Sequence, residues 1–148
     1  MQRSKLLIFI LLSTLVSACG EPADTRPGQP VKHRREAFAN ILKAFEPMGQ
    51  QLRKQQYDAD RFLIHAKALA QAKDVPWRYF GPDTNYPPTH ATAKVWSDPQ
   101  RFELERQAFL AAAARLLVAA ESRDAKVASV AYEALHDQCR SCHKVFKD

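Results

Sequence analysis

Three residues near the C-terminus have the types and the spacing for cofactor chemistry: Cys139, Cys142 and His143. Together they form C-x-x-C-H, the pattern at which haem c is attached to a protein. Residues three apart on a helix share a face, so both thiols could add to the vinyl groups along one porphyrin edge. The adjacent histidine would then reach the iron as its proximal ligand. We therefore predict one covalent haem c, with His143 as the iron ligand.

Other interpretations of the cysteine pair fit the sequence less well. A redox C-x-x-C disulfide usually opens a helix that follows a strand, and no strand-like alternation of useful length occurs in the chain. A structural zinc ion needs four ligands, yet there is no second cysteine pair, and the other histidines are scattered at His33, His65, His90 and His136. The cations of this chain, which has a net charge of +6, alternate with acids rather than cluster, so we expect no nucleic-acid partner.

The first 29 residues predict export and a lipid anchor. Residues 1–18 have a basic start, a short apolar run and a small-residue end, as a secretory signal peptide does. Val16-Ser17-Ala18-Cys19 also resembles a bacterial lipobox, which implies cleavage before Cys19 and lipidation of that cysteine. Residues 19–29 contain frequent Pro and Gly and predict a flexible tether. We expect a periplasmic lipoprotein anchored to a membrane, with the outer membrane slightly favoured because Gly20 is not an aspartate.

Residues 30–148 predict one all-α domain. Apolar residues that recur at three- and four-residue steps predict helices over residues 30–54, 58–73, about 97–120 and 124–146. A kink or break is expected at Pro47, inside the first of them. The helix starts carry capping residues, namely Asp58, Ser97-Asp98 before Pro99, and Ser122 or Asp124.

A long connection, residues 74–97, separates the second predicted helix from the third. It holds several prolines and five aromatic residues, and we expect the aromatic side chains to pin it to the body of the protein. Four amphipathic helices with short or pinned links predict an antiparallel four-helix bundle.

The position of C-x-x-C-H on the last of four helices resembles the cytochrome c prime family, the class II c-type cytochromes. Val31-Lys32-His33-Arg34 is similar to the opening of the family's first helix. Residues 75–77 and 80–82, Val-Pro-Trp and Phe-Gly-Pro, resemble the stretch that closes its second helix. Residues 95–99, Val-Trp-Ser-Asp-Pro, resemble the start of its third. The resemblance covers residues 30–148.

The resemblance implies roles for three further residues. Phe38, seven residues after the opening valine, stands at the family position that faces the sixth coordination site of the iron. Phenylalanine has no lone pair, so the iron would be five-coordinate, as in members that bind nitric oxide and carbon monoxide. Arg34 matches an arginine that pairs with a haem propionate. Lys147 stands where the family usually has an arginine near the proximal face. Lysine keeps the positive charge but lacks the planar guanidinium of arginine.

The predicted function is therefore binding of nitric oxide or carbon monoxide in the cell envelope, without enzymatic activity. The alternative is a one-electron carrier with six-coordinate, low-spin iron and a redox protein partner. Met48, the one methionine after the signal peptide, is ten residues beyond Phe38, about 15 Å along a helix, and is not expected to reach the same iron. Family members commonly pair through their first two helices, so a homodimer is also expected.

Overall fold

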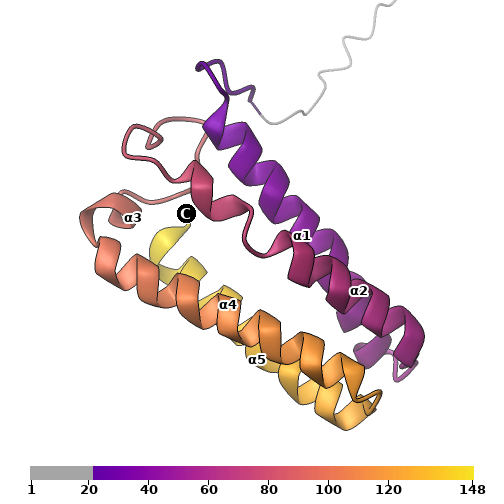
Figure 1. The fold of residues 1–148 in the computed structure, drawn as a ribbon. Coiled ribbons are helices and arrows are strands. Elements are labelled where there is room, and N and C mark those ends of the chain that lie inside the picture. The colour runs from indigo at the N-terminus through magenta and orange to yellow at the C-terminus, as the bar shows by residue number, and fades with distance from the viewer. Residues whose placement is uncertain (1–21) are drawn as a thin grey trace, which may run out of the picture.

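The regular elements of the protein are all helical across residues 22–148, the part described by the computed structural model. In chain order they are α1 (Pro30–Arg53), α2 (Ala59–Ala72), the 3₁₀ helix η1 (Pro76–Tyr79), α3 (Lys94–Ser97), α4 (Pro99–Glu121) and α5 (Ala125–Phe146). Figure 1 shows the long helices lying side by side, with η1 and α3 near the end that holds the C-terminus. The predicted all-α fold is confirmed.

The four long helices form two antiparallel pairs. α1 packs on α2, α4 packs on α5, and α2 lies against α4, which joins the pairs (Figure 1). The core between them consists of large, fully buried apolar side chains: Met48, Phe62, Leu69, Leu116 and Leu135. Burial of each such side chain contributes about 1.5–3 kcal/mol to folding. α1 and α5, by contrast, meet only over a short stretch.

Aspartates start three of the long helices, as the sequence predicts. The carboxylate of Asp58 accepts a hydrogen bond from the backbone N–H of Arg61 at the start of α2, and Asp98 does the same at the start of α4. Asp124 accepts from two backbone N–H groups at the start of α5. These side chains satisfy donors that the first helical turn leaves unpaired.

A break at Pro47 does not occur. α1 runs from residue 30 to residue 53 as one helix, with Pro47 inside it. A proline removes one backbone hydrogen bond. Ile41, Phe45 and Met48, on either side of Pro47, are all buried, and their packing holds both halves of α1 in place.

The connection from α2 to α4 contains regular structure that the sequence did not indicate, namely the short helix α3. Aromatic side chains do pin this connection. The Trp77 ring meets Phe38 of α1 and Phe109 of α4, with centroids 5.6 and 5.7 Å apart. Within the connection, the indole N–H of Trp96 donates to the carbonyl oxygen of Gly81 at 2.9 Å. The Pro87–Pro88 peptide bond is cis.

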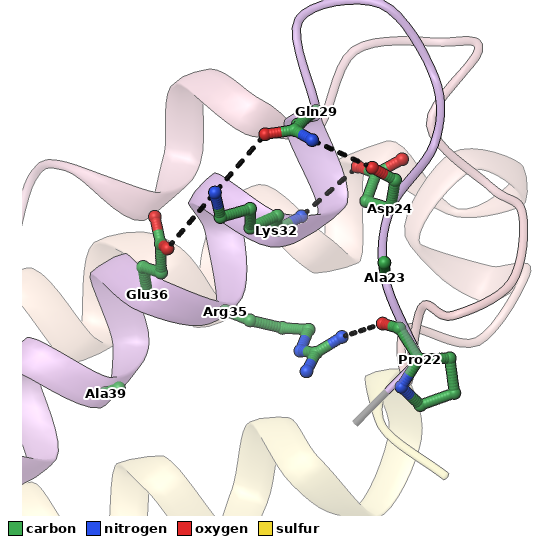
Figure 2. Close-up of a pocket in the computed structure, with 8 residues that line it drawn as sticks. All are labelled: Pro22, Ala23, Asp24, Gln29, Lys32, Arg35, Glu36 and Ala39. Carbon is green, nitrogen blue, oxygen red and sulfur yellow. Dashed lines mark hydrogen bonds and ion pairs between the residues drawn. The ribbon is translucent and has the colours of Figure 1, made fainter. Parts of the chain in front are cut away.

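The N-terminal segment that the structure describes, residues 22–29, is attached to the domain rather than free of it. Asp24 is only 2% exposed. Its carboxylate accepts from the backbone N–H groups of Val31 and Lys32 and from the Tyr86 hydroxyl, and Figure 2 shows it beside the first turn of α1. The flexible tether predicted for residues 19–29 therefore does not extend over Asp24, because a buried carboxylate ties this segment to the helix start. Among residues 22–148, no helix has the length and apolar character needed to span a membrane.

Candidate haem-attachment site

The two cysteines of the C-x-x-C-H motif lie near the C-terminal end of α5, both half-buried and neither in a disulfide. Cys139 packs against the hydrophobic core, whereas His143 is exposed to solvent. The helical conformation predicted for the motif is confirmed, so the two sulfurs stand three residues apart on one helix.

A groove of about 370 Å³ opens beside the motif, between α1 and α5. Its apolar walls include Ile41 and Phe45 of α1 and Leu135 and Cys139 of α5, and His143 also lines it. Charged and polar side chains line the rest: Glu46, Gln50, Arg53, His136 and Arg140. The brief contact between α1 and α5 leaves this space open, next to a thiol and an imidazole.

The protonation states of the motif suit a covalent haem with a histidine ligand. Burial raises the pKa of Cys139 to about 11, and burial together with the nearby charge of Glu105 raises that of Cys142 to about 11. Partial burial and then the positive charge of Lys147 lower the pKa of His143, which favours the neutral imidazole that an iron ligand requires. Two neutral thiols and an available ring nitrogen fit haem c.

The zinc interpretation gains no support from the fold. In the part of the chain that the structure describes, no group of three or more His, Cys, Asp or Glu side chains is arranged to hold a metal ion.

A contact from α4 supports the motif and was not predicted. The hydroxyl of Ser141, between the two cysteines, donates to the carboxylate of Glu105 at 3.1 Å. The two residues are 36 positions apart, so no sequence spacing indicated the contact. It attaches the haem-binding turn of α5 to the neighbouring helix.

Phe38 lies half-buried on α1, one turn before the groove, and is not among the residues that line it. Its ring meets Trp77 edge-on, with centroids 5.6 Å apart, and Phe80 at 6.3 Å. The cluster continues from Phe80 to Phe102, whose centroid is 5.0 Å away. The structure therefore places Phe38 in an aromatic wall, and its role beside the iron stays a prediction.

Arg34 is buried, with only 4% of its surface exposed. Its guanidinium donates to the carbonyl oxygen of Tyr79 at 2.9 Å, to Thr84 Oγ1 at 3.2 Å and to Thr89 Oγ1 at 2.5 Å. It also lies over the Phe80 ring, 4.4 Å from the centroid. These contacts with the connecting loop were not predicted. A bond from Arg34 to a haem propionate stays a prediction.

Lys147 follows the end of α5 and is exposed. It forms an isolated antiparallel bridge with Ala91, and next to it the Thr92 hydroxyl donates to the carbonyl oxygen of Val145 at 2.9 Å. The loop thus holds the chain end, with the Lys147 charge near enough to His143 to lower the pKa of that histidine. A role of Lys147 on the proximal side of a haem stays a prediction.

Two other residues were considered from the sequence, one as an iron ligand and one as a lipid anchor. Met48 is fully buried in the core between the helices and does not line the groove. Cys19, the predicted lipidation site, falls outside the residues that the structure describes.

The fold and motif agree with comparisons to known proteins. The family described as Cytochrome C' matches residues 29–147. The chain is 24% identical to cytochrome c' of Rhodospirillum rubrum over 96% of both chains. It is 28% identical to cytochrome c' of Cereibacter sphaeroides, over 93% of this chain and 96% of the relative.

Solved structures are similar over most of the chain. Cytochrome c' from Rubrivivax gelatinosus has a TM-score of 0.79 at 26% identity, and that from Shewanella frigidimarina 0.79 at 31%, each over 84% of this chain and 98% of the other. A ferrous variant of the Alcaligenes xylosoxidans protein with bound nitric oxide has a TM-score of 0.78 at 28% identity, over 84% and 97%. Another variant of that protein has bound carbon monoxide, with a TM-score of 0.78 at 27% identity, over 84% and 98%.

A four-helix bundle with C-x-x-C-H on its last helix defines a bundle-type c-type cytochrome. The chain belongs to the cytochrome c prime family and carries covalently attached haem c.

Proposed function

We propose that this protein binds small diatomic gases, chiefly nitric oxide and carbon monoxide, at a five-coordinate haem iron in the cell envelope. The observation that carries the proposal is the side chain at position 38. Phe38 offers no donor atom, and the side chains that meet its ring are the equally donor-poor aromatic faces of Trp77 and Phe80. Haem with an open axial position supplies the ligation chemistry for such gases.

The chain's own residues would hold the haem at one end of α5. Cys139 and Cys142 would form the two thioether bonds, and His143 would donate a ring nitrogen to the iron. The apolar walls of the groove, among them Ile41, Phe45 and Leu135, would exclude water from part of the porphyrin. The groove's open, charged side would face solvent.

Two kinds of observation support gas binding over electron transfer. The solved relatives include complexes of the Alcaligenes xylosoxidans protein with nitric oxide and with carbon monoxide. Met48, the methionine that could have made the iron six-coordinate, has its side chain fully buried in the helix core. The His33 ring stacks on Tyr79, and its Nδ1 lies 3.3 Å from the Glu36 carboxylate, so this ring already has two partners.

Absorption spectroscopy of the reduced holoprotein, with and without carbon monoxide, tests the proposal. We expect a high-spin ferrous spectrum that changes fully on addition of carbon monoxide. A low-spin ferrous spectrum that carbon monoxide leaves unchanged would overturn the proposal in favour of the one-electron carrier with a redox protein partner.

The envelope location rests on residues 1–19. We propose that residues 1–18 are removed as a signal peptide and that Cys19 is lipidated, which anchors the domain in the periplasm, on the outer membrane rather than the inner. Mass spectrometry of protein purified from membranes, compared with a Cys19→Ala variant, tests the anchor. A wild-type N-terminus without added lipid would contradict it.

A homodimer through α1 and α2 is also proposed. Two large apolar side chains are exposed on these helices, Leu42 at 51% and Ile64 at 65%. Sedimentation of the wild type beside a Leu42→Glu/Ile64→Glu variant tests it, since only a dimer on this face would dissociate. We propose no enzymatic turnover, because Phe38 and the two rings recorded against it, Trp77 and Phe80, carry no acid–base group, and peroxidase-like chemistry requires one.

A further inference from the structure

The hydrogen-bond acceptors of the buried Arg34 guanidinium are all uncharged, although the charge of Asp24 also acts on it. The oxygen atoms that accept its hydrogen bonds are the carbonyl of Tyr79, the hydroxyl and carbonyl of Thr84, and the hydroxyl of Thr89. Desolvation of a cation is costly unless its donors are well satisfied. All these acceptors belong to one loop, residues 79–89. The hydrogen bonds that offset the cost of burying Arg34 therefore also hold this loop against α1.

The partners of Arg34 span the loop from its start to its middle. Tyr79 ends η1, and Thr89 lies ten residues later. The single guanidinium of Arg34 therefore joins the start of the loop to its middle. The face of the guanidinium covers the Phe80 ring at 4.4 Å and lies 5.9 Å from the centroid of Trp96. Phe80 is therefore fixed both through its backbone neighbour and through its own ring.

Phe80 connects Arg34 to the predicted gas site through its contact with Phe38. Its ring lies 6.3 Å from that of Phe38, and the stacked Trp77 lies 6.2 Å from Phe80 and 5.6 Å from Phe38. Phe38 follows Arg34 by four residues on α1, about one helical turn. Arg34 and Phe38 thus belong to the same helix, and the loop residues Phe80 and Trp77 connect them.

We propose that Arg34 is a positioning residue for gas binding: by holding the loop, it keeps Phe80 and Trp77 against Phe38 and so limits the space beside the iron. The inference rests on the proposed function. It differs from a propionate contact because it acts through the threonines of the loop, which a propionate contact would not involve.

The threonine acceptors allow a test that leaves Arg34 in place. A Thr84→Val/Thr89→Val variant removes two hydroxyl acceptors of Arg34, together with the bonds of these hydroxyls to the Gly81 carbonyl and the Ala91 N–H. Thr84→Ser/Thr89→Ser keeps all of them. Arg34→Met and Arg34→Lys complete the series, and Lys32→Met, an exposed cation on the same turn of α1, is the control. Two measurements on the holoproteins suffice: the association rate of carbon monoxide, and amide hydrogen exchange over residues 79–89.

We expect the valine pair and Arg34→Met to bind carbon monoxide roughly tenfold faster, the rate equivalent of about one lost charge-assisted hydrogen bond. Both should also exchange the loop amides faster. The serine pair and the Lys32 control should match the wild type, and Arg34→Lys should lie between. If Arg34→Met does not fold, the valine pair and Arg34→Lys decide together, since Arg34→Lys leaves both threonine hydroxyls and their other loop bonds in place.

The two proposals fail in different ways. If the wild type does not bind carbon monoxide, the proposed function is wrong and this inference falls with it. If the wild type binds carbon monoxide but the valine pair does so at the wild-type rate, only the inference is overturned. An effect confined to the Arg34 variants would then indicate that Arg34 acts by binding a haem propionate rather than by holding the loop.

Discussion

The haem-attachment turn and the aromatic wall around Phe38 are built in opposite ways. Cys139, Cys142 and His143 come from five consecutive residues of one helix, half open to solvent. The wall draws Phe38 from α1 and Trp77 and Phe80 from a loop, and it is held by hydrogen bonds between residues 45 to 55 positions apart. The predicted attachment chemistry is thus local, whereas the proposed control of the space beside the iron would depend on tertiary structure.

Removal of the attachment chemistry should have the largest effect. In a Cys139→Ala/Cys142→Ala variant, no thioether bond can form, so we expect no covalent haem while the helical bundle persists. Mass spectrometry under denaturing conditions measures the covalent haem directly. A control variant, Ser141→Ala, removes only the hydrogen bond to Glu105 and should keep its haem. Haem covalently retained by the double variant would show that the attachment site lies elsewhere.

A donor atom placed in the aromatic wall should change the iron rather than the attachment. Methionine at position 38 carries a thioether sulfur that can ligate haem iron. We expect Phe38→Met to keep covalent haem, shift the reduced spectrum towards low spin and weaken carbon monoxide binding. Phe38→Leu, which adds no donor, should remain high-spin. A high-spin Met variant with unchanged carbon monoxide binding would mean that residue 38 does not face the iron.

Replacement of Gly49 by alanine adds a methyl group where α1 meets α5, at the far end of the groove, and tests how closely the two helices pack there. A Cβ there would overlap the Tyr132 hydroxyl and come within 2.7 Å of Tyr132 Cζ. Overpacking costs about 1–3 kcal/mol and should exceed the roughly 1 kcal/mol that alanine gains over glycine in a helix. We expect Gly49→Ala to lower the free energy of unfolding measured in urea.

Gly81→Ala is the matched control for Gly49→Ala. Its added Cβ would meet only the Thr84 methyl group, at 3.9 Å, so stability should hardly change. Equal effects of the two substitutions would show that the close approach of Tyr132 does not constrain α1.

The smallest effect concerns Asp24 and depends on pH. Burial alone would raise the pKa of Asp24, but hydrogen bonds from Arg26, Lys32, Tyr86 and Val31 outweigh it and lower the pKa below its usual value. Because the folded-state pKa lies below the unfolded one, the stabilisation is complete above the unfolded pKa of about 3.9 and is lost as pH falls through the folded pKa.

We therefore expect Asp24→Asn to lower the melting temperature at pH 7, and the difference from the wild type to be smaller at pH 3. Asp83→Asn, an exposed aspartate in the loop, is the control and should follow the wild type at both pH values. A deficit in the Asp24→Asn variant that is independent of pH would mean that the carboxylate charge is not what docks residues 22–29.

Much of the fold was predictable because its signals are local. The three-residue and four-residue spacing of apolar side chains, with an aspartate before α2, α4 and α5, placed the long helices within a residue or two of their observed ends. The break considered at Pro47 does not occur, because a proline's local cost says nothing of the packing around Met48 and Phe45 that offsets it. The docking of Asp24 was missed for a similar reason, since its partner Tyr86 is 62 residues away.

By itself, the sequence determined the cofactor and predicted where it is attached, because two thiols and an imidazole at fixed helical spacing specify that chemistry without help from the rest of the chain. Only the tertiary structure decided what surrounds it. The groove between α1 and α5, the contact of Glu105 with Ser141 and the hold of Arg34 on the loop all join residues distant in sequence. Such contacts arise from the way four amphipathic helices share one core, and no periodicity along a single helix encodes them.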